Sequence, residues 1–107
     1  MIALVLAALA LVVSPQAAMA PATVHARVRV PGDVQATTMV FALTGPDYFQ
    51  GSERNFYPTG QQQTIFLPDW THVPSGDYVV VVHLLDRQGH VVAAQQVPVH
   101  VLAGLGG

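Results

Sequence analysis

The chain has no cysteine. That absence excludes a disulfide framework, a thiolate zinc site, an iron–sulfur cluster and a cysteine nucleophile. There is no lysine either, and four arginines face six acidic residues, which gives a formal net charge of -2. A protein that wraps nucleic acid needs clustered cations to displace counterions, so we expect no nucleic-acid partner.

Catalytic motifs are also missing. Ser52 and Ser75 lie in turn-like contexts without a nucleophile elbow, and the sequence has no phosphate-binding glycine loop or paired carboxylates. We therefore expect a protein that is not an enzyme. With 107 residues there is room for one domain, and a hydrophobic content of 51% can supply the core of a small domain without disulfides.

The N-terminus is an uncharged apolar run. Met1 to Val13 reads MIALVLAALALVV and is followed by Ser14-Pro15 and small residues, a pattern typical of a secretory signal peptide. The run is shorter than the roughly twenty apolar residues that span a bilayer comfortably. We predict a signal peptide over residues 1–22, with a retained membrane anchor and a helix packed on the domain as alternatives.

Two cleavage points compete, after Ala20 and after Ala22. Cutting after Ala20 would put Pro21 just past the scissile bond, where a substrate binds in extended form and proline is disfavoured. The sequence thus favours a mature chain that starts at Thr23. Such a protein would be periplasmic or secreted, with no membrane contact after signal cleavage.

The rest of the chain alternates apolar stretches with turn signals. Val24 to Val30 has period two, with valine and alanine on one face and histidine and arginine on the other, as in a half-buried strand. Residues 48–63 have no sustained period and predict long connections around a short strand near residues 55–57. The predicted strands are Val24–Val30, Thr37–Leu43, Thr64–Leu67, Tyr78–Leu85 and Val91–Leu102.

Tyr78 to Leu85 (YVVVVHLL) is almost continuously apolar, which predicts a central strand. One of its faces carries Val79, Val81, His83 and Leu85, where an exposed sheet would be polar. Such a face suggests that a partner protein, a second copy or the N-terminal helix covers it. The alternative is that the domain's own loops do so.

Ser75 to Val92 (SGDYVVVVHLLDRQGHVV) resembles the penultimate hairpin of bacterial immunoglobulin-like and fibronectin-III-like modules. Their pattern is G-x-Y, alternating valines and then D-x-x-G. The resemblance implies an all-β, two-layer antiparallel Ig-like sandwich of six to seven strands, over residues 23–102, with residues 103–107 as a flexible tail. It does not specify a function, because such sandwiches host many unrelated roles.

Five histidines raise the possibility of a metal site. If the chain starts at Thr23, its α-amine, two amides and the imidazole of His25 can surround Cu(II) in a square plane. Gly89-His90 and His25 are also similar to features of periplasmic copper-binding proteins. The candidate copper ligands are His25, His83, His90 and His100, and the alternative is that they are solvated polar residues.

Five aromatic residues could form a stacking platform for a sugar or peptide, or could instead close the end of the sandwich. They are Tyr48, Phe49, Phe56, Tyr57 and Trp70. Our leading expectation is an exported, non-enzymatic binding module of a bacterial periplasm or cell surface. It would hold a protein partner or a second copy through these aromatic residues or through the Val79–Leu85 face. The alternative is a periplasmic copper-binding protein.

Overall fold

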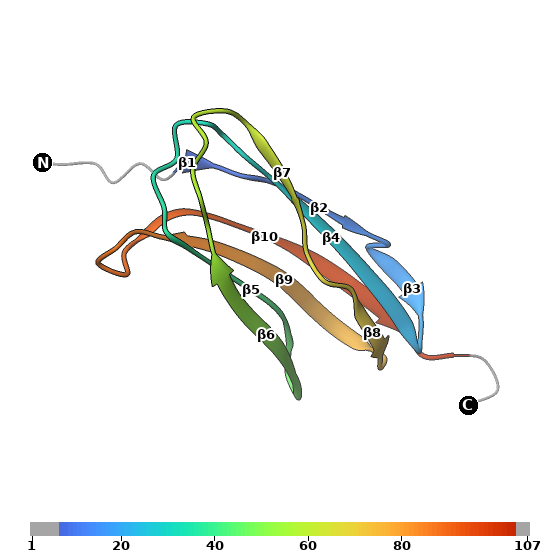
Figure 1. The fold of residues 1–107 in the computed structure, drawn as a ribbon. Helices are drawn as coiled ribbons and strands as arrows, with labels where there is room; N and C mark the ends of the chain where they lie inside the picture. The colour runs from blue at the N-terminus through green and yellow to red at the C-terminus, as the bar shows by residue number, and fades with distance from the viewer. Residues whose placement is uncertain (1–6, 105–107) are drawn as a thin grey trace, which may run out of the picture.

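The computed structural model describes residues 7–104, which form ten strands in two sheets and contain no helix (Figure 1). The larger sheet has the order β1-β10-β9-β5-β6, with β3 also paired to β10. The smaller sheet has the order β2-β4-β7, with β8 also paired to β4. The prediction of an all-β, two-layer fold is confirmed, although the strands number ten rather than six or seven.

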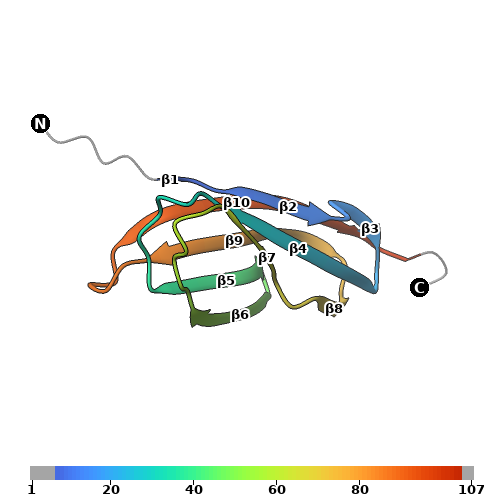
Figure 2. The same ribbon diagram turned by 45° about the horizontal axis from the view of Figure 1, so that its top comes forward.

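The strands of the larger sheet lie side by side in one layer in Figure 2. They are β1 (Ala7–Ala8), β3 (Ala17–Met19), β5 (Thr38–Gly45), β6 (Tyr48–Asn55), β9 (Gly76–Leu85) and β10 (Val91–Leu102). The other layer consists of β2 (Ala10–Ser14), β4 (Ala22–Val30), β7 (Gln63–Phe66) and β8 (Trp70–Val73).

Strand β4 has the alternation that its sequence predicts. Every second residue from Ala22 to Val30 is buried, and the residues between them are exposed. The larger sheet supplies the opposite wall of the core from β5, β9 and β10. The innermost side chains, all below 2% exposed, are Met39, Leu43, Leu84, Val24, Val28, Val30, Val73, Val80, Val82 and Val99.

Strand β9 is central, as predicted, because it lies between β10 and β5. The register of the β9–β10 hairpin is irregular near its turn. Leu85 pairs with Val91, and an irregularity between Val91 and Ala93 then brings Ala94 opposite His83. A bulge of this kind inserts one extra residue into a strand without any change in the apolar pattern that a sequence displays.

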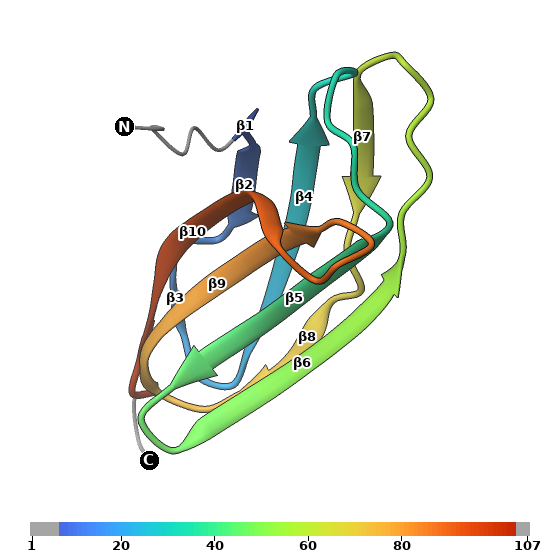
Figure 3. The same cartoon turned by 90° about the vertical axis from the view of Figure 1, so that its left-hand side faces the viewer.

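The prediction for residues 48–63 was wrong over residues 48–55, whereas residues 56–62 do form a connection between strands. Residues 48–55 form the eight-residue strand β6, which pairs with β5 along its whole length. Figure 3 shows β6 as the outermost strand of the larger sheet. Seven of its eight residues are exposed, so backbone pairing holds it in place and no apolar alternation marks it in the sequence.

Strand β8 was also missed, because its four residues follow a proline and include a backbone irregularity. Trp70 and Val73 point into the core, while His72 has a positive φ of 56°. The Trp70 indole donates a hydrogen bond of 3.2 Å to the carbonyl oxygen of Gln50 in β6. This bond connects β8 of the smaller sheet to β6, an edge strand of the larger sheet.

The N-terminal segment closes the opposite side of the sandwich. From Ala7 to Met19 the chain alternates between the sheets, because β1 and β3 pair with β10 and β2 pairs with β4. Both pairings with β10 are parallel, so the expected purely antiparallel arrangement was wrong at this edge. Leu9 and Val13 enter the core at 4% and 6% exposure.

Residues 7–19 are therefore strands, and the alternative of an N-terminal helix packed on the domain was wrong for them. No helix in the described part of the chain is long and apolar enough to cross a membrane. Residues 1–6 of the predicted signal and residues 105–107 of the predicted tail lie outside the described range. The signal peptide stays a prediction, and a cut after Ala22 would remove both Leu9 and Val13 from this core.

We predict that Val13→Ala lowers the free energy of unfolding by roughly 2 kcal/mol, because it deletes buried methyl groups and leaves a cavity. Val12→Ala is the matched control, since Val12 is the neighbouring residue in β2 and is 45% exposed. Its cost should stay below about 1 kcal/mol, the range of a β-propensity change. Urea denaturation of the full chain measures both values. Equal losses would show that β2 does not pack as described.

Candidate functional site

The outer face of the larger sheet carries the residues that the sequence singled out. Val79, Val81, His83 and Leu85 are all half-buried and point away from the core. Val81 lies between Ala42 of β5 and Gln96 of β10 in the strand register.

The neighbouring rows of this face are also mainly apolar. His83 lies between Val40 and Ala94, and Val79 lies between Thr44 and Pro98. Neither β5 nor β10 contains an acidic or arginine side chain. We call the rows of Val79, Val81 and His83, together with their partners in β5 and β10 and with Phe49 of β6, the valine face.

Phe49 extends the valine face toward the sheet edge. It pairs with Thr44, whose other neighbour is Val79, and its ring is 69% exposed. A Cβ atom on Gly51 would lie 2.6 Å from Phe49 Cζ and 3.3 Å from Ala42 Cβ. The ring therefore lies across Gly51 beside Ala42, and a larger side chain at position 51 would push the ring aside. The structure thus joins one predicted aromatic residue to the predicted strand face.

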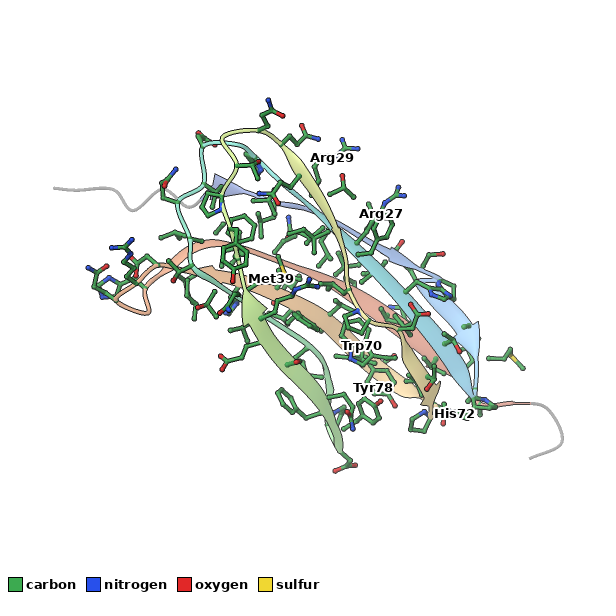
Figure 4. All side chains as sticks on the ribbon, in the orientation of Figure 1. Arg27, Arg29, Met39, Trp70, His72 and Tyr78 are labelled. Atoms are coloured by element: carbon green, nitrogen blue, oxygen red, sulfur yellow. The ribbon has the colours of Figure 1, made fainter. Side chains whose placement is uncertain are left out.

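The other four aromatic residues do not join it on that surface. Phe56 and Trp70 belong to the core; Trp70, labelled in Figure 4, packs edge-on to Phe41 at 6.5 Å between ring centroids. Tyr48 is half-buried in an edge-to-face contact with Tyr78 at 5.3 Å. Tyr57 is 72% exposed. The five predicted platform residues therefore differ in burial and do not form one aromatic surface.

The four candidate copper ligands also lie apart. His25 is on the outer face of the smaller sheet, and its strand β4 does not pair with β10, which carries His100. His83 and His100 are on the larger sheet, and His90 ends the β9–β10 turn. Within residues 7–104, no three histidine, aspartate or glutamate side chains come together as a metal site would need. Copper binding through a free Thr23 amine and His25 stays a prediction.

Two of these histidines make close contacts with single aspartates, and His90 has a longer one of 3.8 Å with Asp86. Nδ1 of His25 lies 2.8 Å from Oδ1 of Asp69, and Nδ1 of His100 lies 2.8 Å from Oδ1 of Asp77. Both pairs are on the surface, where such contacts contribute little to stability.

Tyr78 forms a buried anchor at the start of β9. Its hydroxyl donates a hydrogen bond of 2.7 Å to the carbonyl oxygen of Pro74, and the side chain is 4% exposed. The chain passes close to the ring, since a Cβ on Gly45 would lie 2.7 Å from Tyr78 Cδ1. Burial, and secondarily the nearby Tyr48, raises the pKa of the Tyr78 hydroxyl above its ordinary value.

The outer face of the smaller sheet has a different chemistry, and the sequence reading did not identify it as a site. Arg27 and Arg29 project from β4 away from the larger sheet (Figure 4). An open hollow of about 400 Å³ lies beside Arg27, lined also by Val12, His25 and Phe66. The alternation in β4 predicted outward arginines, but nothing in the sequence indicated which strands would flank them.

Comparisons with known proteins give a likeness of fold alone. No family model matches the chain, and no curated protein sequence matches it. The crystal structure of Spo0M, a sporulation control protein from Bacillus subtilis, is similar to it with a TM-score of 0.57 and 14% sequence identity. The similarity covers 90% of this chain and 49% of the Spo0M chain, so this chain spans about half the length of that protein.

We predict that Tyr78→Phe lowers the free energy of unfolding at pH 7 by about 1 kcal/mol, the net contribution of one hydrogen bond. The raised pKa adds a dependence on pH. Above pH 10, tyrosine ionises in the unfolded chain before Tyr78 ionises in the fold, so wild-type stability falls as pH rises. Tyr78→Phe should lose less stability between pH 9 and pH 11 than the wild type, as measured by urea denaturation. An identical loss would contradict the assignment.

Proposed function

We propose that this protein is a non-enzymatic interaction module, an immunoglobulin-like sandwich whose valine face binds a second copy of the same chain. The observation that carries the proposal is the apolar outer surface of the central strands. Val79 and Val81 lie on a face where a solvated sheet would carry polar side chains. A contiguous apolar patch on the outer face of a sheet, here with the exposed Phe49 at its edge, is typical of an interaction site.

The strand order supports the immunoglobulin-like classification. In such folds one sheet has the strand order C-F-G, where F and G are the last two strands of the chain, and strand B, which precedes C, belongs to the other sheet. Strands β10, β9 and β5 have that arrangement here, with β4 in the opposite sheet. The bond from the Tyr78 hydroxyl to a carbonyl four residues upstream is like the tyrosine corner of these domains.

We assign a second copy of this chain as the occupant of the valine face. Strands β5 and β10 bring no aspartate, glutamate or arginine to it, and the acidic side chains that border it are Glu53, opposite Val40, and Asp77, one row beyond Val79. Two copies can therefore meet over the centre of the face without like charges in contact. Two twisted sheets also pack well face to face when both present small branched side chains. A symmetric dimer would place each Val81 close to the same residue of the other copy.

The likeness to Spo0M is compatible with a binding role. That protein is described as a sporulation control protein, a description that names control rather than a catalysed reaction. At 14% identity, and with about half of the Spo0M chain matched, its own partners are not carried over to this chain.

We predict that the wild-type protein self-associates reversibly and that Val81→Lys abolishes this association. A lysine at the centre of the face would place a charge opposite its symmetry mate and would have to be desolvated in the dimer. Sedimentation velocity over about 10 µM to about 1 mM, the range of weak complexes, measures the association.

Gln62→Lys is the control, because it adds the same charge in an exposed loop and should associate like the wild type. Circular dichroism establishes that both variants are folded. A wild type that stays monomeric at the highest concentration would contradict the proposal, as would a folded Val81→Lys variant that associates with undiminished affinity.

A further inference from the structure

The outer face of the smaller sheet carries an unusual share of the positive charge in this chain. Arg27 and Arg29 are two of only four arginines in a lysine-free sequence, and they are neighbours on the exposed side of β4. Within residues 7–104 every ion pair joins a histidine to an aspartate, so neither arginine has an ion-pair partner there. Both guanidinium groups are available to an external anion.

Apolar side chains flank Arg27 on both neighbouring strands. In the register Arg27 lies between Val12 of β2 and Phe66 of β7, which are 45% and 70% exposed. These three residues border the hollow of about 400 Å³, and a second hollow of about 230 Å³ lies beside Arg29. The face therefore offers two guanidinium donors next to an apolar depression.

The spacing of the two arginines suits an extended acidic chain. Residues two apart on a strand are separated by about 6.7 Å, and the same separation joins alternate carboxylates on an extended peptide. A guanidinium group binds a carboxylate through two parallel hydrogen bonds. This geometry favours a carboxylate at each arginine over an anion held by a single contact.

The position of Asp69 determines toward which end of β4 the carboxylates of a ligand should lie. Asp69 is paired with His25, two positions before Arg27 in β4, so negative charge is already present at that end of the strand. A second anion there would be repelled, whereas the Arg29 end borders Ala10 and Thr64, which are uncharged. The carboxylates of a ligand should therefore lie over Arg27 and Arg29, with an apolar side chain in the hollow between Val12 and Phe66.

We infer that this face binds an extended acidic peptide segment with two carboxylates at alternate positions and an adjacent apolar side chain. A polyanion such as nucleic acid is disfavoured, because two arginines release few counterions and the chain is negatively charged overall. The site lies on the opposite sheet from the valine face and is independent of it.

The test uses a synthetic peptide with blocked ends, in which leucine is followed by two glutamates that alternate with threonines. Titrated into the ¹⁵N-labelled full chain, it should shift the amide resonances of β2, β4 and β7. Arg27→Gln and Arg29→Gln should each weaken binding at least about threefold, within the range of single exposed ion pairs. Raising the sodium chloride concentration should weaken it further.

Three controls keep the inference falsifiable. Arg87→Gln removes an equal charge from the exposed β9–β10 turn and should bind like the wild type. A peptide with glutamine in place of glutamate should not bind, and Phe66→Ala should weaken the leucine peptide more than a peptide with threonine in place of leucine. Unchanged affinity in folded Arg27→Gln and Arg29→Gln, equal binding of the glutamine peptide, or equal shifts with inorganic phosphate would overturn the inference. Because Val81→Lys leaves this face intact, the variant should still bind the peptide whether or not the chain dimerises.

Discussion

Burial of one apolar face from each sheet is the interaction on which the rest of the structure depends. Without cysteine the chain has no covalent cross-link, and within the described residues no polar or charged residue is buried. Stability must therefore come from packing between the layers, where valine and other branched residues interdigitate. The polar and charged residues are left to the outer surfaces, so the chemistry of those two surfaces is what remains for function.

The packing of the N-terminal segment could not be predicted from the sequence. An apolar run followed by small residues is typical of a signal peptide, and nothing in its composition distinguishes that role from a strand that crosses between two sheets. The distinction depends on partners far away in the chain, since β2 needs β4 and both β1 and β3 need β10. Leu9 and Val13 are apolar in either interpretation, and their place in the core follows from tertiary pairing.

Strands with one buried face could be predicted because alternation marks them. In β4 the valines and alanines point inward as their period requires, and in β9 Val80 and Val82 do so while Val79 and Val81 point outward. The valine face could also be anticipated, because a strand that is apolar on both sides must lie in the middle of a sheet. Strand β6 could not, since an exposed edge strand is held by backbone hydrogen bonds that any sequence can make. Phe66 beside Arg27 was equally unpredictable, because a contact across strands depends on register.

The two outer surfaces differ in kind: the valine face is apolar and nearly uncharged, whereas the opposite sheet presents two guanidinium groups beside an exposed phenylalanine. We expect them to act as separate binding surfaces of one sandwich. One series of amide NMR spectra tests this most directly, first with rising protein concentration and then with the acidic peptide. Rising concentration should shift resonances of β5, β9 and β10, while the peptide should shift those of β2, β4 and β7. Shifts of the same set of residues in both titrations, or of none, would contradict it.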